Sequence, residues 1–358
     1  MAQQEQEKNR KTTLVVEVVP GMYQIRLPVP VRSLGSVFVY LVRSAGHNML
    51  IDTGWDGAES YAGLKEAMSH IGMKLSEIEK IIISHLHPDH FGLSARLKEE
   101  SPNAIVMMHR ADAASLRDTR EKFDRFLAEL HEWMKVNGVP QSDVEAMSNS
   151  SLPMSSFTPP AKPDVELIGG ERIRIGDAWN FLVIPTPGHT AGNICLYDDA
   201  GSKLLFSGDH VLPSITPNVS LSPLYKGGDP LGDYLSSLEE LRPLDVSKVL
   251  PSHEYIFTGL AARIDQIETH HRERLEDAVH VLEGGGDAVS AYHVASKLRW
   301  YAGSWDALSA WEKRAALMET LAHLEYLKRR GRVAEIQEML DSSKSIVYSL
   351  ISGKQSAC

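Results

Sequence analysis

The chain has 358 residues, enough for one large core and an additional region. Of these residues 43% are hydrophobic and 23% charged, which is the composition of an ordinary globular protein. Its net charge of -10 argues against a nucleic-acid partner, because binding a polyanion usually needs clustered lysine and arginine. No apolar run approaches the ~20 residues that span a bilayer, so we expect no membrane partner.

The polar beginning of the sequence, MAQQEQEKNRK, lacks the apolar stretch of a secretory signal. Two cysteines, Cys195 and Cys358, cannot build a disulfide framework. Both observations predict a cytoplasmic protein.

Strand-like and helical segments alternate in the first hundred residues. Apolar, β-branched segments bounded by turn residues predict strands, and the segments 61–72 and 93–100 read as helices. The expected strands of this region are 14–19, 36–42, 48–54, 80–85 and 104–109.

The residue pattern changes after residue 110. A helical period covers 111–138, and a Ser/Pro-rich loop follows at 148–163. Strands then resume, and from about Thr258 onward the chain is expected to be nearly all helical, with a glycine break at 284–286. The strands expected in this second half are 171–176, 181–186, 193–197, 203–209 and 248–253.

The segment IIISHLHPDHFGL, residues 81–93, places three histidines and an aspartate directly behind an apolar strand. Side chains two positions apart on an extended segment point the same way, which pairs His85 with His87. The proline that follows keeps His87 extended and suits a first helical turn, so Asp89 and His90 begin the next helix. The two pairs could serve two adjacent metal ions.

A catalytic zinc needs about three protein ligands plus a water, so the chain must supply more. Three later strand ends do so: TPGHTAGN offers His189, LFSGDH offers Asp209 and LPSHE offers His253. Each follows an apolar strand, where a sheet presents residues on one common edge. The alternative, a chance grouping of polar loop residues, is much weaker than metal ligation.

The succession H-x-H-x-D-H, PGHT, SGD and a strand-ending histidine resembles the metallo-β-lactamase superfamily, and more narrowly its glyoxalase II-like and lactonase-like branches. The resemblance covers residues 12 to about 260. It implies an α/β fold, the αββα sandwich of two stacked mixed sheets flanked by helices, with the metals at one edge. The implied domains are a catalytic domain at 1–260, with a helical insertion at about 110–163, and a helical, winged-helix-like domain at 261–358.

The same resemblance implies two divalent metal ions per chain, zinc in the first instance, with iron or manganese as alternatives. It assigns His85, His87 and His189 to one ion, Asp89, His90 and His253 to the other, and Asp209 to both as a bridge.

Two further residues are expected near the metals. Asp52, in LIDTG, would partner the second nitrogen of a metal-bound imidazole, although it could also be only a turn residue before Gly54. His210 directly follows Asp209, either as a substrate contact or support for a ligand, or as an ordinary surface-loop histidine.

Departures from the family pattern narrow the prediction. True metallo-β-lactamases commonly carry a thiolate at the position of Asp209. An oxygen ligand that can bridge favours a dinuclear site and argues against antibiotic hydrolysis. Flavodiiron proteins of this fold carry Glu at the position of His87, so this histidine argues against that branch. Asn193 replaces a histidine often seen in glyoxalase II-like relatives, without the loss of a ligand.

The resemblance and the ligand set together predict a hydrolase in which a metal-bridging hydroxide attacks the carbonyl of a small ester, thioester or lactone, with Asp89 and Asp209 as the catalytic carboxylates. The alternatives are a phosphodiesterase or endoribonuclease, a persulfide-dioxygenase-like oxidoreductase with a single iron, and a catalytically silent interaction module.

The regions around the metal core should set substrate choice. In the insertion, Phe123 is expected to pack between helices, whereas Met154 and Phe157 are candidates for a lid or pocket wall. Between His270 and Glu335 there are ten Lys or Arg and ten Asp or Glu, so the C-terminal domain has no basic face and is expected to pack rather than to bind nucleic acid. The sequence is compatible with both a monomer and a homo-oligomer.

Overall fold

The computed structural model describes residues 14–30, 35–116, 119–150, 160–199, 201–223, 228–301, 303–340 and 343–351. The chain divides into two units that are described in turn. The first consists of Met1–Thr119, Ser155–Pro217 and Glu240–Arg263, and the second of Arg120–Met154, Asn218–Glu239 and Ile264–Cys358. The helical insertion predicted at about 110–163 as part of the catalytic domain therefore falls largely within the second unit.

The first unit contains a seven-stranded sheet whose strand order follows the chain. Strands β1 to β4 are antiparallel neighbours, and β4 to β7 run parallel. The strands are β1 (Leu14–Val19), β2 (Met22–Pro28), β3 (Ser36–Ser44), β4 (His47–Ile51), β5 (Lys80–Ile83), β6 (Ile105–His109) and β7 (Val165–Leu167).

A second sheet of five strands has the order β12-β11-β10-β9-β8. Neighbours from β8 to β11 are antiparallel, and β12 pairs parallel with β11. The strands are β8 (Arg172–Ile175), β9 (Trp179–Pro185), β10 (Ile194–Asp198), β11 (Leu204–Gly208) and β12 (Lys248–Pro251).

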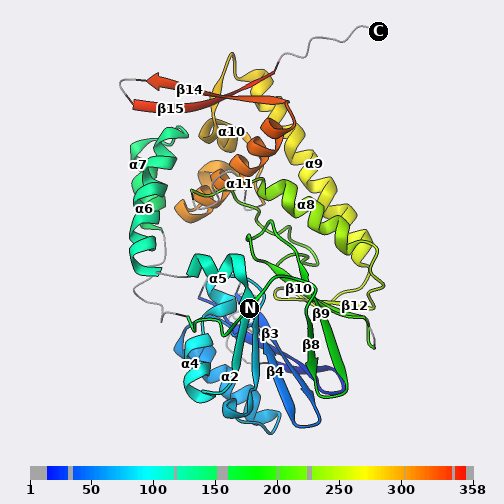
Figure 1. Ribbon diagram of the computed structural model, residues 1–358. Helices are drawn as coiled ribbons and strands as arrows, with labels where there is room; N and C mark the ends of the chain where they lie inside the picture. The colour runs from blue at the N-terminus through cyan, green and yellow to red at the C-terminus, as the bar shows by residue number, and fades with distance from the viewer. Residues whose placement is uncertain are drawn as a thin grey trace, which may run out of the picture. The chain divides into compact units, whose positions relative to one another are not determined.

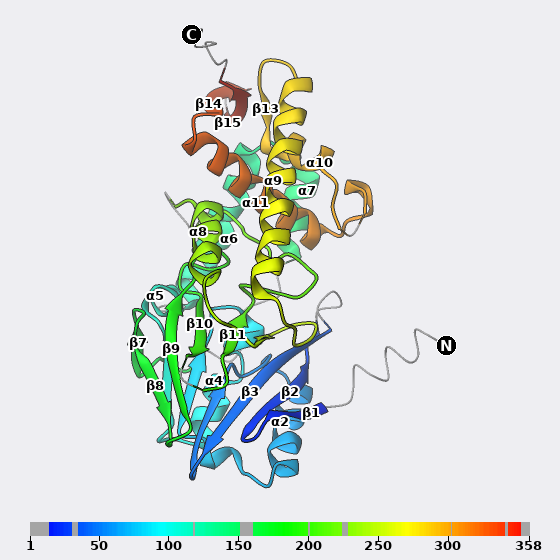
Figure 2. The ribbon, with the colours of Figure 1, turned by 90° about the vertical axis from the view of Figure 1, so that its right-hand side faces the viewer.

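The two sheets lie face to face, and helices cover the other face of the first sheet (Figure 1 and Figure 2). Strand β5 shows why its three consecutive isoleucines are needed: Ile82 enters the core between the sheets, whereas Ile81 and Ile83 enter the core beneath the helices. A central parallel strand is buried on both faces, so it reads as a continuous apolar run. The helices of this unit are α2 (Ala58–His70), η1 (Leu75–Glu77), α3 (Pro88–Phe91), α4 (Ser94–Glu100) and α5 (Arg110–Leu116).

The second unit is mainly helical. Its elements include α6 (Thr119–Val136), α7 (Gln141–Asn149), α8 (Pro230–Leu241), α9 (Leu260–Gly284), α10 (Ala291–Lys297), η3 (Trp305–Ala307) and α11 (Ala310–Arg329), with some ends crossing the division. None of the helices in the described ranges combines the length and the apolar character that a bilayer crossing requires.

The expectation of a nearly all-helical C-terminal region is wrong in one respect. Strands β13 (Val289–Ser290), β14 (Val333–Leu340) and β15 (Ser343–Leu350) form an antiparallel sheet of order β13-β15-β14. The sequence of β14, VAEIQEML, is rich in good helix formers, but pairing with β15, which buries Val347 and Tyr348, overrides that local preference. The winged-helix-like character of the region stays a prediction.

Candidate metal centre

The seven predicted ligands all follow strand ends of the first unit. His85 and His87 come directly after β5, and the extended backbone of His87 (φ -81°, ψ 146°) leads into α3, which begins at Pro88. Asp209 follows β11 and His253 follows the parallel strand β12, so these two side chains leave the second sheet at the same edge. His189 lies in the loop between β9 and β10.

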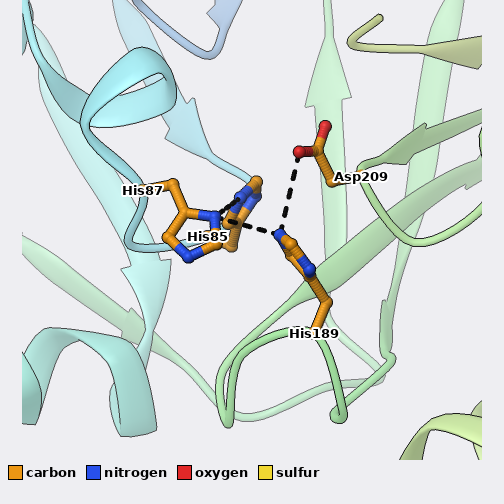
Figure 3. Close-up of side chains that lie close together, drawn as sticks. All are labelled: His85, His87, His189 and Asp209. Carbon is orange, nitrogen blue, oxygen red and sulfur yellow. Dashed lines mark hydrogen bonds and ion pairs between the residues drawn. The ribbon is translucent and has the colours of Figure 1, made fainter. Parts of the chain in front are cut away.

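Three histidine rings and one carboxylate form the first ligand group (Figure 3). Nδ1 of His87 lies 3.0 Å from Nε2 of His85 and 3.0 Å from Nε2 of His189, and the latter nitrogen lies 3.7 Å from Oδ2 of Asp209. One ring nitrogen can either donate or accept a hydrogen bond, so His87 cannot satisfy both neighbouring rings. A cation among these nitrogens resolves the conflict.

The second ligand group is richer in carboxylate. Nε2 of His253 lies 3.4 Å from Oδ2 of Asp89 and 3.4 Å from Oδ1 of Asp209, and Nε2 of His90 lies 3.6 Å from the same Asp209 oxygen. These buried nitrogens and oxygens make no hydrogen bond within the described part of the chain. Asp209 thus presents one carboxylate oxygen to each group.

The donor set fits two divalent ions. In each group the candidate ligand atoms lie within 4.8 Å of one another, and imidazole nitrogen with carboxylate oxygen is a common ligand combination for zinc. The structure therefore brings all seven predicted ligands together.

The remaining ring nitrogens are held by hydrogen bonds. Nδ1 of His90 donates to Oδ2 of Asp52 at 2.8 Å, and Nδ1 of His253 donates to the backbone carbonyl of Ser36 at 2.9 Å. The Ser84 hydroxyl donates to Asp52 at 2.7 Å and so accepts from Nδ1 of His85 at 3.0 Å. Each bond places the proton on Nδ1 and leaves Nε2 free to bind a metal.

Asp52 has a backbone φ of 59°, in the left-handed region that aspartate tolerates better than most residues. The same side chain accepts a bond from the backbone N–H of Ser84 at 2.7 Å. The structure therefore places the carboxylate directly behind His90.

The two ligand groups differ in the protonation state that their surroundings favour. Burial lowers the pKa of His85 well below its ordinary value and that of His87 to about 3, so both rings are neutral. Burial acts the same way on His253, but the adjacent Asp209 carboxylate outweighs it and raises that pKa to about 10. For Asp89, burial favours the neutral acid, yet His90 holds its pKa at about 2.

His210 is fully buried, and burial together with His189 lowers its pKa to about 3. It is therefore not a surface-loop histidine, and a contact to substrate stays a prediction. Met154 and Phe157 lie outside the described residues.

Asp112 belongs to none of the motifs that contain the predicted ligands. This fully buried carboxylate lies in the first turn of α5 and accepts hydrogen bonds from both histidine-bearing loops of the first group. Its signal was its place just after the apolar strand AIVMMH, the same position relative to a strand that pointed to the other site residues.

The sequence comparisons agree with this geometry. The family model of the metallo-beta-lactamase superfamily matches residues 32–253. The chain belongs to this superfamily. The predicted fold class, two stacked mixed sheets with flanking helices and a largely helical C-terminal region, is confirmed.

Three relatives show how far the likeness extends. Probable metallo-hydrolase YqjP of Bacillus subtilis is 28% identical over 323 residues, 88% of this chain and 94% of the relative. A crystal structure of a metallo-beta-lactamase family protein from Thermus thermophilus has a TM-score of 0.75 at 25% identity, covering 94% of this chain and all of that one. An acyl-coenzyme A thioesterase of Gallus gallus is 29% identical over 230 residues, 61% of this chain and 73% of the relative. Membership of this family supports a hydrolase.

Proposed function

We propose that the protein is a dinuclear, zinc-dependent hydrolase of small thioesters, esters or lactones. The observation that carries the proposal is the orientation of Asp209, which turns Oδ2 toward His189 and Oδ1 toward His90 and His253. A bridging carboxylate serves two ions at once, and a site for a single ion would not need it.

The chain's own residues would hold and shield the reaction. His85, His87 and His189 would bind one ion, Asp89, His90 and His253 the other, and Asp209 both. Bound divalent ions supply Lewis acidity to a substrate carbonyl and lower the pKa of water.

The surroundings of the ligands favour this chemistry. Asp52 and the Ser36 carbonyl fix the rings of His90 and His253, so neither ligand must reorient during turnover. His85 and His90 are fully buried, and exclusion of water strengthens every charge interaction at the centre.

Several observations support a carbonyl substrate. One relative is named as an acyl-coenzyme A thioesterase, and the net charge of -10 disfavours a long polyanion. A persulfide-dioxygenase-like site with one iron would leave the ligand group of Asp89, His90 and His253 without a role.

The proposal is tested by metal analysis of the purified protein together with a substrate screen. We expect two zinc ions per chain and faster hydrolysis of a thioester, ester or lactone than of a bis-aryl phosphate, RNA or a β-lactam. One iron per chain with oxygen consumption, or phosphodiester cleavage faster than every carbonyl substrate, would overturn it.

A further inference from the structure

Asp112 is a buried carboxylate held by three hydrogen bonds from two separate loops. Its Oδ2 accepts from the backbone N–H of Leu86 at 2.8 Å and from the hydroxyl of Thr190 at 2.8 Å, and its Oδ1 accepts from the backbone N–H of Gly192 at 2.7 Å. In the described ranges, no lysine or arginine acts on the charge of this side chain. Burial of such a group is costly unless these bonds are made.

The three donors bracket the histidines of the first ligand group. Leu86 separates His85 from His87, and Thr190 directly follows His189. A bond to the backbone N–H of Leu86 restrains the peptide units on both sides of it. One carboxylate therefore connects the loop after β5 with the loop before β10 and restrains all three histidines.

Gly192 provides independent evidence that this close approach is built into the fold. A Cβ added at this position would lie 2.6 Å from the backbone nitrogen of Asp112 and 2.7 Å from its Oδ1. Both distances are too short for any side chain, so only glycine lets the loop reach the carboxylate.

The same carboxylate contributes negative charge behind a group of neutral rings. Burial raises the pKa of Asp112 to about 6, against the lowering effect of its hydrogen bonds, so the side chain is mainly ionised at neutral pH. Charge-assisted bonds of this kind are stronger than neutral ones and fix loop geometry more firmly.

We propose that Asp112 is a positioning residue for the first metal: by joining the two loops it sets the spacing of His85, His87 and His189 and so the affinity of that group for its ion. The inference rests on the proposed function, because it requires the first group to bind a metal. Asp52 has the corresponding place in the second group, where it bonds the His90 ring directly.

The test measures metal binding at one position. In a His253→Ala background the second position is disabled, so titration of metal-free protein with Co²⁺, followed by its visible absorption, reports the first. The matched control is Asp198→Asn, because Asp198 is equally buried and accepts two bonds, from Ser202, in a turn that carries no ligand.

We expect Asp112→Asn to weaken Co²⁺ binding at the first position about 10- to 100-fold and to change the cobalt absorption bands. Asp198→Asn should leave both unchanged. In a His189→Ala background, Asp112→Asn should leave Co²⁺ binding at the second position unaltered. Equal Co²⁺ affinity of the Asp112 and Asp198 variants at the first position would overturn the inference while leaving the proposed function intact.

A milder variant covers the case in which Asp112→Asn does not fold. Thr190→Val removes one of the three donors and preserves shape, and it should weaken Co²⁺ binding at the first position by less than the full effect but measurably. Wild-type affinity and an unchanged cobalt spectrum in folded Thr190→Val would then reject the positioning role. A wild-type chain that binds no divalent ion would overturn the proposed function itself, and this inference with it.

Discussion

Two clusters of buried histidines, one in each unit, differ in how their ring nitrogens are paired. In the second unit, Nδ1 of His323 donates to the backbone carbonyl of Glu319 at 2.8 Å, and Nδ1 of His271 donates to Nε2 of His323 at 3.1 Å. Each Nδ1–H of this pair therefore has a hydrogen-bond acceptor. In the metal centre, Nδ1 of His87 faces two ring nitrogens at once. The direction of the nitrogens, more than the burial of histidines, indicates a metal site.

The two clusters also differ in how nearby carboxylates affect the pKa values of their histidines. Burial lowers the pKa of His323 to about 4 and that of His271 well below its ordinary value, and no carboxylate in the described part of the chain reverses the effect. At the metal centre, Asp209 outweighs burial and raises the pKa of His253 to about 10. The second unit holds a neutral pair, whereas the first holds a charged cluster built for cations.

The largest expected effect is that of Asp209→Ala. Because its two oxygens face different groups, the variant should lose metal from both positions, and hydrolysis should fall on the order of 1,000-fold or more. Metal analysis and initial rates measure this. His323→Gln, in the other histidine cluster, should keep the wild-type metal content; two retained ions and full activity in Asp209→Ala would show that the ligand assignment is wrong.

Single-position variants sharpen the comparison further. His189→Ala should mainly empty the first position and His253→Ala the second, because each ring belongs to one group. Metal content should drop from two ions to about one in either variant. Loss of both ions from each variant would contradict the division into two groups.

The sequence revealed the ligand set because strand ends are visible locally. Each ligand follows an apolar run, and the parallel pairing of β11 with β12 then brings Asp209 and His253 to one edge. Asp112 also comes shortly after an apolar strand, but its role could not be read from that position, because two of its three partners are backbone N–H groups 26 and 80 positions away. Such bonds leave no side-chain pattern in the sequence.

The fold was predictable to a similar degree. The central strands read clearly as apolar runs, whereas β2 (MYQIRLP) does not, because partly buried residues separate the buried Met22, Ile25 and Leu27. Strand β14 was missed because its composition favours a helix and only its pairing with β15 decides otherwise. The grouping of residues 120–154 with the C-terminal region depends on tertiary packing that no local pattern records.

A smaller effect is expected from Asp52→Asn. The amide keeps the shape but cannot offer a negatively charged acceptor to the Nδ1–H of His90, so metal affinity at the second position should fall about 10- to 100-fold. Competition with a chelator measures it in the His189→Ala background. An unchanged affinity would mean that the Asp52 carboxylate does not support His90 as a metal ligand.

The smallest effect concerns acid stability of the second unit. The folded-state pKa values of His271 and His323 lie below the ordinary 6.5, so stability is complete above that pH and is lost as the unfolded chain takes up protons below it. Lowering the pH from 6.5 to 5.5 should cost about 1 kcal/mol for each histidine. Denaturant titrations at both pH values measure this.

A double difference isolates the contribution of the pair. His323→Leu should reduce the loss of stability between the two pH values, whereas His280→Gln, at an exposed position, should have little effect on it. An equal loss in wild type and His323→Leu would mean that the pair does not carry the acid sensitivity.

The most direct test of the dinuclear hydrolase is a zinc titration of the metal-free chain, with bound zinc and hydrolysis of an acyl-coenzyme A thioester followed together. Binding should saturate at two ions per chain, and activity should appear as the second group of Asp89, His90 and His253 fills. Saturation at one ion with full activity, or two bound ions without hydrolysis of any thioester, ester or lactone, would contradict it.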